Sequence, residues 1–203
     1  MQSNSQIHRL TSDAPDYPAA LLRTLGAEAP PWLDTEGNLA LLHTPTLGLV
    51  CSAKAPGSIL LHVHDLAQQW RTTGPTLVSG FHSPAEQEVL AVLLRGPQTI
   101  ILCPARSLLR MRLKPEYREP LAEGRLLLLS PFPEYVQRAT AETALQRNRL
   151  VAALADALLV AHAEPEGKTA HLVQEIASWG KPLYTLDHPS NAHLGLPHLV
   201  SRP

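Results

Sequence analysis

The sequence predicts an α/β fold in which helices cover both faces of a mostly parallel sheet. Apolar runs at 47–51, 99–103, 125–129 and 157–161 have the length and unbroken hydrophobicity of strands buried on both faces. Longer segments with helical spacing separate these runs, which is typical of repeated strand–helix units. At 203 residues, the chain is long enough for one domain with a proper core.

The N-terminal part predicts a flexible segment over 1–16 in front of a domain at 17–203. The domain is expected to open with a short helix at 17–25. A hairpin-like entry is predicted over 32–42, with its turn around Gly37, because glycine favours tight turns.

Helix start signals support the next elements. Ser58 is the expected N-cap of a helix that ends near residue 72. Ser83 and Glu86 form a capping box for a helix at 84–94, with proline at its first position. The remaining elements are a strand at 76–78, helices at 115–123, 140–154 and 169–179, and a strand at 182–186.

Composition limits the classes of function. The chain is 44% apolar and 4% aromatic, and 17 basic residues stand against 18 acidic ones. A dedicated duplex-binding domain usually shows a basic excess, so any nucleic-acid site must be a local patch. Cys51 and Cys103 end apolar runs and are predicted to be buried thiols in a reducing compartment. With no secretory signal and no run long enough to span a membrane, we expect a cytoplasmic protein.

Four loops follow the carboxyl ends of the predicted strands, where open parallel sheets bind their ligands. Each loop offers glycine, a hydroxyl group or a positive charge, which are the groups that bind anions at helix N-termini. These candidate binding residues are Ser52, Lys54, Ser79, Gly80, Arg106, Gly167, Lys168 and Thr169.

A further candidate is the run Arg147-Asn148-Arg149, which lies on a helix just before a buried strand. Arginine donates in a planar, bidentate fashion and suits phosphate or carboxylate recognition. The alternative is that these arginines cap carbonyl groups and stabilise the fold. The sequence leaves both interpretations open.

Other chemistries have less support. Gly167-Lys168-Thr169 ends like a phosphate-binding P-loop, but the first glycine of that motif would fall on His162. Ser79 lacks the flanking glycines of a nucleophile elbow. The ten histidines show no metal-ligand spacing. We therefore expect no metal, no cofactor and a binding protein rather than an enzyme.

Five short motifs follow one another along the chain at 17–21, 48–54, 78–80, 96–101 and 147–163. In this order they resemble motifs of the DprA/Smf family of DNA-processing proteins. The most extended is R-N-R with the apolar helix and strand that follow it, which the chain matches over 147–163. The others resemble the family's Y-P-x-x-L, V-G-S-R, V-S-G and G-x-T-I-A-V elements. They lie at 17–21, 48–54, 78–80 and 96–101.

This resemblance implies an extended Rossmann-like, three-layer sandwich and a single-stranded-DNA-binding recombination mediator. Such a protein assists the loading of a RecA-type recombinase during DNA uptake or repair, and a homodimer is possible. The chain departs from the family after Gly80, where A-x-G-I-D-x-x-A-H is replaced and its aspartate is missing. It also lacks room for the flanking helical and winged-helix domains. A stand-alone core with altered specificity is therefore expected.

The competing hypothesis is a protein that binds or hydrolyses a phosphorylated nucleotide, related to the lonely-guy phosphoribohydrolases. Their P-G-G-x-G-T-x-x-E motif is only loosely echoed by Pro165, Gly167, Thr169 and Glu175, and its double glycine is absent.

Overall fold

In the computed structural model, which describes residues 7–199, one mixed sheet of eight strands crosses the molecule in the order β1-β2-β6-β5-β4-β3-β7-β8. The six strands from β6 to β8 in this order are parallel, whereas β1 and β2 join one edge antiparallel. The strands are β1 His8–Thr11, β2 Trp32–Gly37, β3 Thr46–Cys51, β4 Thr76–Ser79, β5 Ile100–Leu102, β6 Leu126–Ser130, β7 Ala157–His162 and β8 Leu183–Thr185.

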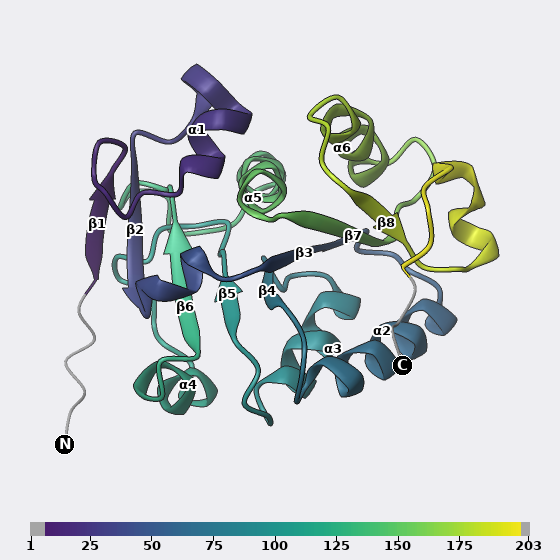
Figure 1. Cartoon of the computed structure of the whole chain (residues 1–203), viewed down its shortest axis with the longest axis horizontal. Coiled ribbons are helices and arrows are strands. Elements are labelled where there is room, and N and C mark those ends of the chain that lie inside the picture. Colours follow the sequence, from purple (N-terminus) through teal and green to yellow (C-terminus); the bar gives the residue numbers. More distant parts are fainter. Residues whose placement is uncertain (1–6, 200–203) are drawn as a thin grey trace.

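Helices cover both faces of this sheet, so the predicted three-layer α/β architecture is confirmed (Figure 1). One face carries α1 (Ala19–Leu25), α5 (Ala141–Leu154) and α6 (Lys168–Ala177). The opposite face carries α2 (Gly57–Trp70), α3 (Pro84–Leu93) and α4 (Arg118–Ala122). The 3-10 helices are η1 Gly26–Glu28, η2 Leu39–His43, η3 Pro115–Tyr117 and η4 Pro189–Leu194.

The uninterrupted apolar runs are explained by burial on both faces of the sheet. Along β6, Leu127 and Leu129 enter the core beneath α5, whereas Leu126 and Leu128 enter the core beneath α3. Successive side chains of a strand point to opposite faces, so a strand between two helical layers needs apolar residues at every position.

Of the two predicted N-caps, Ser83 is confirmed and Ser58 is not. Ser83 caps α3, and its capping box with Glu86 is present. The start of α2 differs from the prediction. Pro56 holds the N-cap position there without a side-chain cap. Ser58 lies inside the first turn, where its Oγ is 2.8 Å from Nε2 of His188.

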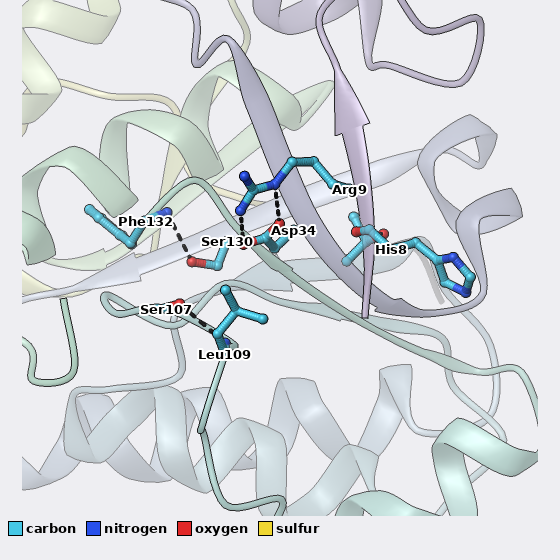
Figure 2. Close-up of polar contacts among 8 residues, drawn as sticks. His8, Arg9, Asp34, Ser107, Leu109, Ser130 and Phe132 are labelled. Carbon is cyan, nitrogen blue, oxygen red and sulfur yellow. Dashed lines mark hydrogen bonds and ion pairs between the residues drawn. The ribbon is translucent and has the colours of Figure 1, made fainter. Parts of the chain in front are cut away.

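Two N-terminal predictions are wrong. Residues 8–11, expected within a flexible segment, form β1, and Arg9 binds Asp34 of β2 at 2.7 Å (Figure 2). The Arg9 guanidinium also stacks 3.8 Å from the centre of the Trp32 ring. The expected hairpin partner at 39–42 is instead the 3-10 helix η2, which the Asn38 side chain caps. Both predictions are wrong because the strand partners are distant in sequence. β1 pairs with β2, and β2 pairs with β6 in place of residues 39–42.

Over residues 7–199, we find no helix long and apolar enough to cross a membrane.

We predict that Gly48→Ala lowers the free energy of unfolding by about 1–3 kcal/mol, because overpacking a dense core has this cost. A methyl group at Gly48 would lie 2.7 Å from Cδ1 of Leu158 and 2.9 Å from Cβ of Ala155. Urea unfolding measures the change. The matched control is Gly57→Ala at the start of α2, where nothing lies within 4 Å. Equal stability of the two variants would contradict close packing of β3 on β7.

Candidate functional site

The loop between β4 and α3 lies at the carboxyl end of the sheet and has a constrained backbone. Ser79 is fully buried, and its Oγ accepts a hydrogen bond from the Phe81 amide at 3.1 Å. Phe81 has φ +46, a conformation that a bulky residue rarely adopts. Such strained residues persist only where the surroundings hold them, and they gather at binding sites.

A buried carboxylate holds this loop against the neighbouring strand. Glu86, only 3% exposed, accepts hydrogen bonds from the amides of Cys51 at 2.9 Å, His82 at 2.7 Å and Ser83 at 3.2 Å. One side chain on α3 therefore joins the end of β3 to the start of its own helix. The sequence predicts that the family's aspartate is missing after Gly80. Counted from Val78 without a gap, the aspartate of V-S-G-x-A-x-G-I-D falls on Glu86, so the spacing from Val78 is the signal that locates this acidic residue.

Arg147 reaches the same loop from α5 and is 3% exposed. Its guanidinium occupies the space that a side chain at Gly80 would need, since a Cβ there would lie 1.2 Å from Nη1 of Arg147. Nη1 donates to the Cys103 carbonyl at 3.3 Å, and Nε donates to Oδ1 of Asn148 at 2.7 Å. The Arg147 side chain can therefore occupy this position only if residue 80 is a glycine.

The charge of Arg147 is buried but partly balanced. Burial lowers the pKa of its guanidinium below the ordinary value, and the nearby Glu86 carboxylate opposes this shift. A guanidinium stays protonated in proteins, so the site contains a fixed and largely buried positive charge.

A basic pocket of about 380 Å³ opens above Gly80 and Arg147. Its apolar lining includes Phe81, Leu102 and Met111. Its described lining residues include no Asp or Glu. Five cationic side chains border it: Arg106, Arg112, Lys114, Arg138 and Arg147.

Hydrogen bonds to the backbone fix the loop that carries Arg106. Ser130 Oγ at the end of β6 donates to the Arg106 carbonyl at 2.8 Å and accepts from the Phe132 amide at 3.2 Å. Ser107 Oγ accepts from the Leu109 amide at 3.1 Å; Figure 2 shows the Ser107 and Ser130 contacts to Leu109 and Phe132. The pocket wall is therefore preorganised.

The predicted site residues separate into groups. Gly80, Arg106 and Arg147 line the basic pocket, and Asn148 orients Arg147. The lining of this pocket does not include Ser52, Lys54, Ser79, Gly167, Lys168 or Thr169.

Several of these remaining residues lie around the ends of β3 and β7. Ser52 donates its amide to the His162 carbonyl and accepts from the Glu164 amide at 3.0 Å. The Gly167 amide donates to the Glu164 carbonyl, and Thr169 is buried at the start of α6. The candidate side chains Lys54 and Lys168 are exposed.

Arg149 has a different environment from Arg147, although both lie on α5. Its Nη2 pairs with Glu28 at 2.6 Å and its Nε pairs with Glu175 at 2.7 Å. These ion pairs join α5 to η1 and α6. Of the two arginines, Arg147 borders the basic pocket and Arg149 connects neighbouring elements.

Among residues 7–199, no group of three or more His, Cys, Asp or Glu side chains is placed to hold a metal ion.

The fold and the pocket define a Rossmann-like protein with a basic pocket at the carboxyl ends of β4 and β5. Residues 8–201 match the family model of DNA recombination-mediator protein A, and the chain belongs to that family. The resemblance drawn from the five sequence motifs is thereby confirmed. Among curated proteins, none matches the sequence.

Solved structures show the same fold. DNA processing protein A from Streptococcus pneumoniae superposes with a TM-score of 0.80 at 18% identity, over 97% of this chain and 72% of that one. DNA processing protein A from Helicobacter pylori, described in terms of its single-stranded DNA binding mode, gives 0.73 at 22% identity, over 94% and 85%. The molybdenum cofactor carrier protein of Chlamydomonas reinhardtii gives 0.50 at 17% identity, over 77% and 89%.

We predict that Gly80→Ala costs about 1–3 kcal/mol of stability, because the new methyl group displaces the Arg147 guanidinium. The same substitution in an Arg147→Ala background should cost much less, since the conflicting group is gone. Urea unfolding of the four proteins of this double-mutant cycle gives the coupling. Equal costs in the two backgrounds would show that the two positions do not compete for one space.

Proposed function

We propose that this chain binds single-stranded DNA through the basic pocket and acts as a recombination mediator. The observation that carries the proposal is the concentration of five cations around one pocket in a chain whose formal net charge is −1. Phosphate contacts dominate the affinity of proteins for nucleic acids, so a local cluster of this kind is sufficient for binding. The single-stranded DNA binding described for the related Helicobacter pylori protein supports this assignment.

The pocket also offers apolar surface for bases. Proteins that bind single strands combine a cationic groove with aromatic side chains on which bases stack. Tyr135 does not line the pocket itself, but it is 85% exposed and lies three residues before Arg138, which does. The Ser107 amide holds the segment between these two residues by donating to the Val136 carbonyl at 2.9 Å. We assign Tyr135 to base stacking beside the phosphate-binding arginines.

The competing nucleotide hypothesis has less support. Family membership favours DNA processing, and the loop at Gly167 uses its own hydrogen-bonding groups internally.

The remaining parts of the proposal concern cellular context. A recombination mediator passes single-stranded DNA to a recombinase, so we propose a RecA-type partner. We also propose a homodimer and a cytoplasmic location. Cys51 and Cys103 are free, buried thiols, which agrees with a reducing compartment.

We predict that Arg106→Ala weakens oligo-dT binding several-fold and reduces the slope of log affinity against log salt by about 0.7, the contribution of one phosphate contact. Arg149→Ala serves as the control, because its ion pairs lie outside the pocket, and we expect unchanged affinity. Fluorescence anisotropy across a salt series measures both quantities. Absence of oligo-dT binding by the wild-type protein at about 50 mM salt would refute the proposed function.

We predict that Tyr135→Ala weakens oligo-dT binding by about fivefold or more, since stacking contributes roughly 1–3 kcal/mol per base. The salt slope should stay unchanged, because no phosphate contact is lost. Tyr135→Trp should retain the affinity, and quenching of the introduced indole would report stacking directly. A Tyr135→Ala variant with wild-type affinity would exclude this residue from the interface.

A further inference from the structure

Glu86 has more contacts than a helix cap requires. A capping box needs only the bond from its carboxylate to the N-cap amide, here that of Ser83. Glu86 also binds the amide of His82 and, 35 residues away in sequence, the amide of Cys51 on β3. The carboxylate is therefore surrounded by donors from two segments at the ligand-binding end of the sheet.

The position of Glu86 relates it directly to the basic pocket. Gly80, Phe81 and His82 line that pocket, and Glu86 lies behind them, bound to the His82 amide. Arg147 fills the space above Gly80 and interacts electrostatically with the Glu86 carboxylate. Both side chains are 3% exposed, so water screens their charges weakly.

This arrangement has two consequences for an incoming phosphate. The amides of His82 and Ser83 already donate to Glu86, so they are not available to a ligand. The negative charge of Glu86 also opposes the positive charge of Arg147, which reduces the attraction that a phosphate feels there. The other pocket cations, Arg106, Arg112, Lys114 and Arg138, come from the connection after β5 and the segment before α5.

We propose that Glu86 is a specificity-determining residue that selects a polymer of phosphates over a single phosphate. Because the loop amides are occupied and the Glu86 charge opposes that of Arg147, one phosphate binds weakly beside Arg147. A single strand of DNA compensates by contacting several of the other pocket cations at once, namely Arg106, Arg112, Lys114 and Arg138. This inference rests on the proposed function. Its test also measures the binding of inorganic phosphate and thymidine monophosphate, which does not require that the protein bind DNA.

The test compares Glu86→Gln with the wild-type protein for three ligands: inorganic phosphate, thymidine monophosphate and oligo-dT. Glutamine preserves the shape and one acceptor oxygen but removes the charge. We expect the affinity for phosphate and thymidine monophosphate to rise at least about fivefold, which is the scale of one weakly screened charge interaction. The preference for oligo-dT over the mononucleotide should fall accordingly. A merely structural role predicts the opposite, a loss of affinity for every ligand.

Two variants complete the design. Glu88→Gln, two residues along α3, removes a carboxylate that contacts His64 outside the pocket, and it should change none of the affinities. Glu86→Asp keeps the charge and should keep the wild-type selectivity. If Glu86→Gln weakens phosphate binding or leaves it unchanged, the inference is wrong.

Folding failure would also be informative. If Glu86→Gln does not fold unaided, its refolding yield is compared with and without added phosphate. An increase with phosphate supports the inference, and no increase overturns it. If the wild-type protein does not bind oligo-dT while Glu86→Gln gains phosphate binding, the proposed function and the preference for a polymer both fail. The effect of Glu86 on the binding of a single phosphate is then all that stands.

Discussion

The carboxyl end of the sheet depends on two opposite charges that the fold removes from water, the carboxylate of Glu86 and the guanidinium of Arg147. Burying an unpaired charge is costly, so each must find fixed partners. Glu86 finds three backbone amides, and Arg147 finds the Cys103 carbonyl and the Asn148 side chain. These partners come from β3, the loop before α3, α5 and the end of β5, and they determine where the surrounding loops lie.

The same constraint shapes the pocket. Because Arg147 must lie across the loop after β4, position 80 has no room for a side chain. The cations that border the open part of the pocket come from the connection after β5 and from the segment before α5. A chain with a formal net charge of −1 thus presents a locally positive pocket, because the described lining residues include five cations and no Asp or Glu.

The fold was predictable from sequence where local pattern and final environment agree. Four runs were recognisable as strands because burial on both faces makes almost all of their residues apolar. These runs, at 47–51, 99–103, 125–129 and 157–161, all lie in the parallel part of the sheet. The β1 strand was not predictable, because only its pairing with β2, 20 or more residues along the chain, makes it a strand.

The site was predictable only in part. Strand ends and the family motif identified Gly80, Arg106 and Arg147, which do line one pocket. Sequence could not separate Arg147 from Arg149, since two positions on a helix differ by about 200° in direction and only the packed structure shows which faces the sheet. The role of Glu86 was also hidden, because one of its partners, Cys51, is distant in sequence.

The sheet topology determines how the chain can acquire its structure during synthesis. β3 lies inside the sheet between β4 and β7, yet β7 follows about a hundred residues later in the chain, with Leu47 opposite Ala157. β2 likewise pairs with a strand much later in the chain, β6, with Asp34 opposite Ser130. Long-range strand pairing is slow, and unpaired apolar strands are prone to aggregate. A nascent chain that ends before β7 leaves β3 unpaired along one side. Most of the polypeptide must therefore leave the ribosome before β3 gains its second neighbouring strand.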